Sequence, residues 1–248
     1  MWRRDVDGQV LTFHLAGINN QNFLMRDEET GSFWQQISGK CVAGPMAGRE
    51  LKLVYSDEVT AALWREENPN GMILSPLSKY KSEYEKKDWD KKMAKVRTVL
   101  DFPKTGIASR ELMFGIAWNG ASKAFPVKRL LDEKVVLDRV GGEPVLIVVG
   151  PDGKSIRAFH RKIPNAEAAP DFYRAVDVRD VKAEDANAVA EAAKKPLLMD
   201  AATGSEWNFK GCAVSGKAQG TCLEPIPALK DYWFDWRNYH PNTTVYNR

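Results

Sequence analysis

Asp27-Glu28-Glu29-Thr30-Gly31-Ser32-Phe33-Trp34 has a diverged second copy in this sequence of 248 residues, Asp200-Ala201-Ala202-Thr203-Gly204-Ser205-Glu206-Trp207, which keeps the pattern Asp-x-x-Thr-Gly-Ser-x-Trp. One residue is lost after the second copy, and from there the two segments align at an offset of 172. Nine of 37 ungapped positions are then identical, against roughly two expected from ordinary composition. The identities are Gly39/Gly211, Val42/Val214, Gly44/Gly216, Gly48/Gly220, Leu51/Leu223, Trp64/Trp236, Arg65/Arg237, Pro69/Pro241 and Asn70/Asn242. A diverged duplication with a pseudo-twofold arrangement is predicted.

The repeated unit has the composition of a turn that leads into a strand. The carboxylate of Asp27 can accept backbone N–H bonds, and Gly31 can take a positive φ. The strand would begin at Trp34, so the unit is predicted to lock each half of the chain. Its polar and aromatic side chains are also the weak ligand-binding candidates of the sequence: Asp27, Thr30, Ser32, Trp34, Asp200, Thr203, Ser205 and Trp207.

Each copy of the unit is followed by glycine-punctuated strands and a helix. Strands are expected at 40–43 and 50–55, then a helix capped by Ser56 that ends before Pro69. In the second copy the helix is expected to open near Pro227, with Leu229, Trp233, Trp236 and Tyr239 at helical spacing. Trp64 and Trp236 are expected in the core, with an aromatic ligand platform as the alternative.

A β-rich block lies between the copies. Asn119-Gly120 inside 115–125 predicts a hairpin with a type I′ turn. A helix at 127–131 and strands at 135–140, 145–149 and 155–160 follow. The alanine-rich segment 181–195 predicts a further helix, and 76–99 is a charged helix or a linker. Its mixed-sign charges are typical of a solvated face.

These elements predict an α+β fold that is predominantly β, built from two pseudo-twofold-related repeats of short antiparallel strands with a few helices. The first repeat would span 1–75 and a charged helix or linker 76–105. The second repeat would span 106–248, with its hairpin and strand block at 114–162, a helical insertion at 181–195 and the Thr-Gly-Ser unit at 200–248.

Bulk composition narrows the class of protein. The hydrophobic content of 44% and charged content of 28% are those of an ordinary globular protein. A net charge of +3 does not favour nucleic-acid binding. The longest apolar run, 145–149, is far shorter than a transmembrane segment, and the N-terminus lacks the pattern of a signal peptide.

In combination, several motifs resemble the bacterial domain-of-unknown-function family 3179. They are Asp27–Trp34, Ala43–Gly48, the Gly115–Pro126 hairpin, Val140–Leu146, Arg157–Phe159 and Trp233–Pro241. The resemblance implies architecture and no activity. It also implies export, hence a periplasmic or extracellular location; a cytoplasmic one is the alternative because no signal peptide is visible.

The sequence departs from this family in its first half. Family members usually carry the hairpin and strand block in both halves, whereas here it precedes only the second unit. Trp2-Arg3-Arg4 lines up with Phe159-His160-Arg161, so about 45 residues are missing from the first half if the duplication was once complete. The family's Cys-Pro-Leu-Cys-like element lies in that block and has no residues here. Either the chain is a shortened form, or a protein partner or a second copy of the chain completes the first repeat.

Chemistry-bearing residues form no recognisable catalytic set. His14 and His160 each follow a Phe in an expected strand and are the weak candidates for a metal, although no ligand spacing supports one. His240 suits a helix C-terminus. Neither Ser32 nor Ser205 has a partner base in the sequence, and no cofactor is identified. Asp27 and Asp200 would share a proton or a cation if they faced each other.

Cys212 and Cys222 flank Lys217 symmetrically. If the segment is a hairpin, they lie opposite each other and are candidates for a disulfide, which would agree with export. Two reduced, buried cysteines are the equal alternative.

The preferred hypothesis is a non-catalytic, extracytoplasmic protein that binds a ligand or a partner. An enzyme using the Asp, Thr and Ser side chains of the repeated units at an inter-repeat cleft is the first alternative. A subunit of a larger assembly is the second. A cleft lined by both units would favour the enzyme, and burial of Asp27 and Asp200 in their own turns would favour the scaffold.

Overall fold

The computed structural model describes residues 1–19, 22–86, 88–98, 106–164, 166, 168–175 and 178–247. Within these residues the fold is mostly β, with five α-helices and several small sheets. All strand pairs of the described part are antiparallel except β16 with β8. The expectation of a predominantly β fold with a few helices is confirmed.

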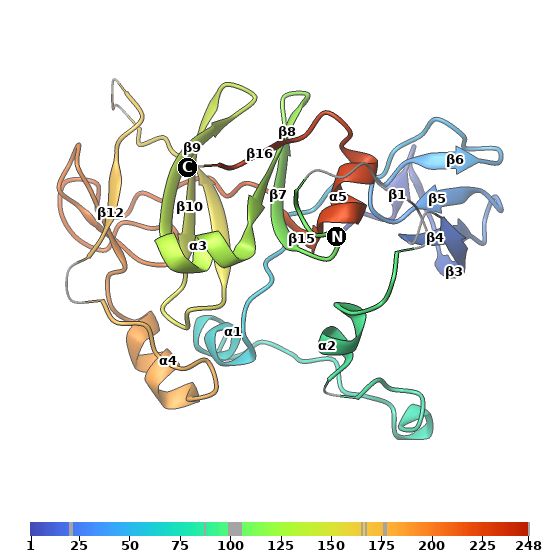
Figure 1. Cartoon of the computed structure of the whole chain (residues 1–248), viewed down its shortest axis with the longest axis horizontal. Coiled ribbons are helices and arrows are strands. Elements are labelled where there is room, and N and C mark those ends of the chain that lie inside the picture. The colour runs from blue at the N-terminus through green and yellow to red at the C-terminus, as the bar shows by residue number, and fades with distance from the viewer. Residues whose placement is uncertain are drawn as a thin grey trace.

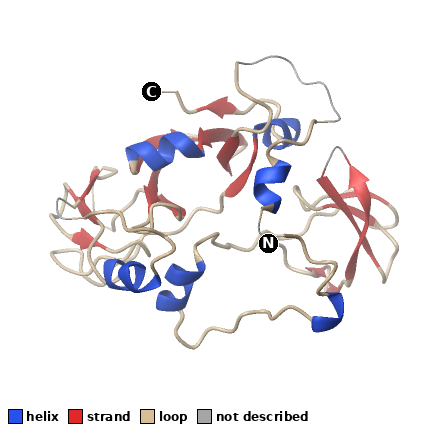
Figure 2. Ribbon diagram, turned by 60° about the horizontal axis from the view of Figure 1, so that its bottom comes forward, coloured by secondary structure: helices blue, strands red, loops and turns tan. Residues whose placement is uncertain are grey.

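The N-terminal sheet contains β3 (Phe13–Asn19), β4 (Asn22–Asp27), β5 (Phe33–Gln35) and β6 (Cys41–Ala43), in that order. A small ribbon of β1 (Asp5–Val6) and β2 (Gln9–Val10) precedes it. Side chains from these segments make a separate small core around Trp34, which is fully buried. Figures 1 and 2 both show this sheet at one end of the molecule.

The predicted hairpin forms the centre of a second sheet. Its strands are β7 (Leu112–Trp118) and β8 (Ala121–Pro126), joined by Asn119 and Gly120 with φ of 49° and 74°, the left-handed values that a type I′ turn requires. β15 (Leu229–Tyr232) pairs with β7, and β16 (Thr244–Val245) pairs with β8. The hairpin prediction is confirmed.

A third sheet packs against this hairpin. It contains β9 (Val135–Val140), β10 (Glu143–Val149) and β11 (Ile156–His160), as predicted, and α3 (Val127–Glu133) leads into it. Val145 through Val149 are all buried, which explains why they read as a continuous apolar run. Ile116, Phe125 and Ile147 share one core between the two sheets.

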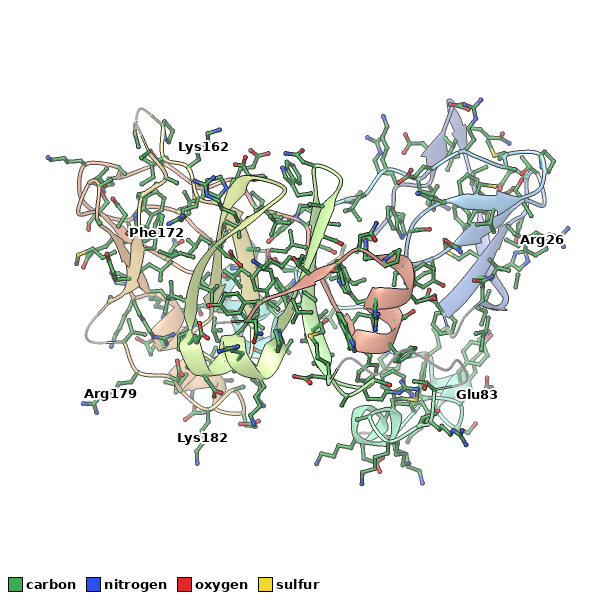
Figure 3. All side chains as sticks on the ribbon, turned by 45° about the horizontal axis from the view of Figure 1, so that its top comes forward. Arg26, Glu83, Lys162, Phe172, Arg179 and Lys182 are labelled. Carbon is green, nitrogen blue, oxygen red and sulfur yellow. A yellow bond between two sulfur atoms is a disulfide. The ribbon has the colours of Figure 1, made fainter. Side chains whose placement is uncertain are left out.

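The remaining sheet contains β12 (Phe172–Arg174), β13 (Leu198–Asp200) and β14 (Glu206–Trp207). Its core centres on Trp207, against which Phe172 packs edge to face at 5.5 Å. Figure 3 labels Phe172 at this end of the molecule. The helix α4 (Ala186–Ala193) adds Val189 to this core and confirms the alanine-rich prediction, over a shorter span.

Two helices pack on parts of the protein that are distant from them in the sequence. α1 (Ala61–Glu67) follows the N-terminal sheet in the chain, yet it packs on α4 and places Leu63 in the core around Trp207. α5 (Trp233–Tyr239) is near the C-terminus and contacts the N-terminal sheet through Asn22, whose Nδ2 lies 2.9 Å from Asp235 Oδ2. Figure 1 shows α1 beside α4 and α5 between the hairpin and the N-terminal sheet.

Three expected elements differ from the structure. Residues 50–55 are not a strand and make only isolated bridges, such as Trp2 with Leu53. α1 is capped by Thr60 and not by Ser56, because the chain stays extended while it crosses to the other sheets. Leu229 belongs to β15 and not to a helix, because its backbone pairs with Gly115 of the hairpin.

The charged segment contains one 3₁₀ turn, Ser78–Tyr80, and the short helix α2 (Trp89–Met93). Figures 1 and 2 show it running outside the sheets. Residues 99–105 of the predicted linker lie outside the described part of the chain. Among the described helices, none is both long and apolar enough to cross a bilayer.

Candidate functional site

The first repeated unit is a closed hydrogen-bonded turn around Asp27, which is fully buried. Its Oδ1 accepts from Thr30 N at 2.5 Å. Its Oδ2 accepts from Ser32 N at 3.1 Å, from Thr30 Oγ1 at 3.0 Å and from Trp34 Nε1 at 2.8 Å. Burial raises the pKa of Asp27, but the bonds from Trp34, Thr30 and Ser32 outweigh it and leave the pKa below the ordinary value.

The second unit repeats these contacts around Asp200, which is 1% exposed. Its carboxylate accepts from Thr203 N, Thr203 Oγ1, Ser205 N and Trp207 Nε1 at 2.5, 2.6, 3.2 and 2.9 Å. Burial again acts against the charge, and the bonds from Thr203, Trp207 and Ser205 still lower the pKa of Asp200.

Both serine hydroxyls are engaged in holding a neighbouring loop. Ser32 Oγ accepts from Met46 N at 3.1 Å, and Ser205 Oγ accepts from Ala218 N at 2.8 Å. A Cβ added to Gly44 would come within 2.7 Å of Ser32 Cα, and one added to Gly216 would do the same to Ser205 Cα. Glycine is therefore required where the loop crosses each serine. Among the described residues neither hydroxyl is hydrogen-bonded directly to a carboxylate or an imidazole, and the geometry favours a structural role.

The two units do not meet. Trp34 belongs to the core of the N-terminal sheet and Trp207 to the core beside α4. Each carboxylate is bonded within its own turn, so the arrangement in which Asp27 and Asp200 share a proton is not present. Thr203, with Lys217 and Asp171, lines an open hollow of about 630 Å³ on the surface.

The histidines suggested for a metal also lie apart. His14 is exposed on β3, whereas His160 is buried on β11 with its Nδ1 3.2 Å from Glu143 Oε1 and its ring 4.6 Å from that of Trp118. No group of three or more His, Cys, Asp or Glu side chains suited to a metal occurs among the described residues.

Cys212 and Cys222 form a disulfide across an isolated antiparallel bridge, with Cα atoms 4.0 Å apart. Cys41 is a buried free cysteine. At the offset of 172, the disulfide corresponds to Lys40 and Glu50, which also face each other across an isolated antiparallel bridge.

The main candidate site is a cleft of about 600 Å³ between the N-terminal sheet and the hairpin sheet, which we call the inter-sheet cleft. One wall is supplied by N-terminal residues and the other by β7, β15 and α5. A volume of this size lies within the usual range for small-molecule sites. None of the eight candidate residues of the repeated units is among its lining residues: Met1, Trp2, Asn22, Gln36, Ile37, Ser38, Lys40, Glu50, Leu53, Val54, Ser56, Gly115, Ala117, Pro227, Ala228, Leu229, Lys230, Asp231, Trp236, Tyr239 and His240.

A pair of carboxyl groups lies at this cleft. Asp231 lines it, and Asp235, 5% exposed, lies behind and receives the bond from Asn22 Nδ2. Burial and the neighbouring Asp235 raise the pKa of Asp231 to about 7. Burial also raises the pKa of Asp235. The two acids therefore titrate as a pair that keeps a shared proton well above the pH at which an ordinary carboxyl loses it.

Two further ionisable side chains of the cleft come from the end of α5. Burial raises the pKa of Tyr239, and the nearby Asp235 and Asp231 add to the effect. Burial lowers the pKa of His240, with a smaller contribution from Lys40, so the imidazole is neutral at pH 7. His240 also stacks on Trp236, with ring centroids 4.0 Å apart. Trp236 is thus both a core residue, 2% exposed, and part of a wall of the cleft.

A smaller cavity of about 260 Å³ lies at the junction of α1 with the C-terminal sheets. Arg157 dominates it: its guanidinium makes two 2.7 Å bonds to Glu67 and a 2.9 Å bond to Asp57, and lies 4.5 Å above the ring of Phe209. Burial lowers the pKa of Arg157, and the bonds to Glu67 and Asp57 more than compensate. Tyr55 donates to Asp57, and burial raises the pKa of Tyr55.

The two cavities have corresponding linings. At the offset of 172, six residues of the smaller cavity align with six residues of the inter-sheet cleft. The pairs are Tyr55/Pro227, Asp57/Leu229, Glu67/Tyr239, Asn68/His240, Lys210/Ser38 and Pro225/Leu53. The smaller cavity has less than half the volume and is lined by the ion pairs of Arg157, so the inter-sheet cleft is the better site for a ligand.

Sequence reasoning missed Asp231, Asp235 and Asn22. The available signal was the spacing of two acids four residues apart beside Trp233-Phe234 and Trp236, an apolar setting in which charged side chains are unusual. Asn22 gave no signal, because its contact with Asp235 joins residues that are 213 positions apart.

Comparison with known proteins identifies the family. No curated protein and no solved structure matches the chain. One family model, described as a protein of unknown function (DUF3179), matches residues 1–243. Since the match covers nearly the whole sequence, this chain belongs to the DUF3179 family.

Proposed function

We propose that this chain is a non-catalytic, extracytoplasmic binding protein whose ligand site is the inter-sheet cleft. The observation that carries the proposal is that this cleft joins apolar walls to Asp231, Tyr239 and His240, whereas the repeated units are closed turns. A mostly apolar pocket with a few converging polar groups is the usual form of a small-molecule site.

The disulfide supports the extracytoplasmic part of the proposal. Disulfides persist in oxidising compartments and are uncommon in the cytosol. Cys212 and Cys222 are joined here, while Cys41 is free and buried. Under denaturing, non-reducing conditions we expect one reactive thiol per chain, and three after reduction. Three thiols before reduction would remove this support.

The architecture that makes the cleft is, in our proposal, a diverged duplication with pseudo-twofold symmetry. The repeats are 1–75 and 106–248, and 76–105 connects them. The equal hydrogen bonds around Asp27 and Asp200 and the corresponding cavity linings support this reading. In this reading the helix of each repeat, α1 or α5, packs on the other repeat. Both cavities then lie at the boundary between the repeats.

Binding in the cleft is tested by a substitution that fills the cleft with a large side chain. Ala117 is exposed on β7 and lines the cleft, so Ala117→Trp would fill the space without changing a buried side chain. Ala43→Trp is the matched control, because Ala43 is also exposed on a strand but lies outside the cleft.

The three proteins would be expressed in a cell that exports this family, purified under native conditions and analysed for bound small molecules by mass spectrometry. We expect the same molecule from the wild type and from Ala43→Trp, and none from Ala117→Trp. Equal recovery from all three proteins, or from none, would contradict the proposed function.

A second role, in a homo-oligomer, is favoured by one surface. Leu15, Ile18 and Phe23 are 64%, 71% and 55% exposed on β3 and β4, and β3 is an edge strand of its sheet. Such an edge can pair with a second copy of the chain. We expect light scattering to give a mass above 27.9 kDa, and Ile18→Lys to return the monomer. A monomeric wild type at every concentration tested would contradict this role.

A further inference from the structure

The inner part of the inter-sheet cleft is rich in hydrogen-bond acceptors. Asp231 lines it, Asp235 lies behind Asp231, and Asn22 reaches in from β4. The Nδ2 group of Asn22 donates a hydrogen bond to Asp235 Oδ2. Among the described residues, Asp235 Oδ1 and Asn22 Oδ1 are buried and accept no hydrogen bond from any donor.

Unmet acceptors of this kind are costly. A buried oxygen without a donor loses its bonds to water and gains nothing in return. Burial raises the pKa of both carboxyl groups, and the charge of Asp235 adds to the effect on Asp231, so a proton held by the pair relieves part of this cost. A cationic N–H group entering the cleft would relieve more, because it supplies several donors and a positive charge.

Two of the protein's own cations near the cleft have other partners. Lys230 is paired with Glu58, and Arg110 donates to Val96 O and lies over the rings of Tyr232 and Phe234. Arg110 acts on Asp231 only as a minor charge contribution. Lys40 lies on the opposite wall, across an isolated bridge from Glu50.

Part of the wall is apolar. Trp2, Leu53, Val54, Leu229 and Trp236 contribute to it, and Gly115 lets the indole of Trp236 come close to β7, since a Cβ there would lie 2.3 Å from the indole. A ligand that satisfies the acidic pair can therefore place an alkyl or aromatic portion along this wall.

We propose that the inter-sheet cleft binds a primary amine with an apolar tail, its ammonium group held by Asp231 and Asp235 and its tail lying against Trp236 and Leu53. This inference rests on the proposed function and adds the chemical class of the ligand. The ammonium donates to the carboxylate oxygens and to Asn22 Oδ1, and no covalent step is involved.

The test compares three probes of equal length: hexylamine, hexanol and hexanoate. Their binding is measured by isothermal titration calorimetry at pH 8, where hexylamine is protonated and the pH lies above the pKa of about 7 of Asp231. The proteins are the wild type, Asp231→Asn, Asp235→Asn, Ala117→Trp and the control Ala43→Trp. Circular dichroism checks that each variant is folded. If Asp235→Asn does not fold, Asp231→Asn alone tests the role of the carboxylate pair.

We expect the wild type and Ala43→Trp to bind hexylamine at least about tenfold more tightly than hexanol, and hexanoate more weakly than either. Either Asp→Asn variant should lose the preference for the amine while still binding hexanol. Ala117→Trp should bind no probe.

Two results would overturn the inference, and they separate it from the proposed function. If Ala117→Trp abolishes binding but the wild type does not prefer hexylamine, or keeps its preference in both Asp→Asn variants, the cleft binds apolar ligands and the amine class is wrong. If Ala117→Trp binds every probe as the wild type does, or no probe binds the wild type, the cleft is not the site and both proposals fail.

Discussion

At the scale of single residues, Asp27 and Asp200 show how a repeated motif can be structural and still look catalytic. Each is a buried carboxylate beside a serine and a threonine, the residue types of many active sites. Each carboxylate, however, accepts four hydrogen bonds within its own turn. A charge held by this many donors stabilises the turn and has no remaining capacity to take a proton from a substrate.

Replacing Asp200 by Asn should therefore destabilise the fold. An amide NH₂ group would face the donors of Thr203, Ser205 and Trp207, and we expect a loss of roughly 2–4 kcal/mol in the free energy of unfolding. Urea unfolding at pH 7 measures it. Asp132→Asn is the control, because Asp132 is exposed on α3, and it should change the stability by less than about 0.5 kcal/mol.

The pH dependence of this loss has a definite sign. The pKa of Asp200 is lowered in the folded protein from the ordinary value of 3.8. Its stabilisation is therefore fully present above pH 3.8 and is lost as the pH falls through the folded pKa. The difference between the wild type and Asp200→Asn should be constant from pH 7 to about pH 5 and shrink below pH 4. A difference that grows on acidification would show that Asp200 is not held as a carboxylate.

At the scale of elements, the sequence was sufficient wherever local chemistry determines the structure. Asn119-Gly120 predicted its hairpin because the turn needs two positive φ values. The strands at 135–140, 145–149 and 155–160 were predicted because turn residues separate apolar runs. The start of α1 was not predicted, because Thr60 is held by a 2.7 Å hydrogen bond from its Oγ1 to Asp152 Oδ2, which lies 92 positions away in the sequence.

The candidate site was less predictable than the elements. Its carboxyl pair, Asp231 and Asp235, gains its properties from burial against Asn22 and β7, and neither contact is visible in a linear pattern. The repeated turns have a recognisable sequence motif, whereas the segments that line the cleft share none. Only the folded chain brings those segments together.

The correspondence between elements makes a prediction that can be tested by cross-linking. Lys40 and Glu50 occupy the positions of Cys212 and Cys222, and Cys41 the position of Ala213. The triple variant Lys40→Cys, Cys41→Ala, Glu50→Cys should form a second disulfide. For so short a loop we expect up to about 2–3 kcal/mol of added stability.

A thiol count under denaturing, non-reducing conditions, combined with the shift in unfolding temperature on reduction, measures this. We expect no free thiol in the triple variant. The control is the double variant Lys40→Cys, Cys41→Ala, which should show one free thiol. Two free thiols in the triple variant after mild oxidation would mean that the two hairpins are not equivalent.

At the scale of the whole molecule, α1 and α5 connect parts of the chain that are distant in sequence. Leu63 of α1 lies in the core around Trp207, and Asp235 of α5 meets Asn22 of the N-terminal sheet. Arg157 adds an ion pair to Glu67 of α1 with both side chains less than a tenth exposed. The hydrogen bond from Asn22 to Asp235 therefore links the two walls of the inter-sheet cleft.

The central claim is that the inter-sheet cleft, and not the repeated turns, is the ligand site. Hydrogen–deuterium exchange of the wild type, with and without saturating hexylamine, tests it most directly. We predict added protection on both walls of the cleft, at residues 36–38 and 228–231, with no change in the turns at 27–32 and 200–205. Protection confined to the turns, or protection on neither wall, would contradict the account.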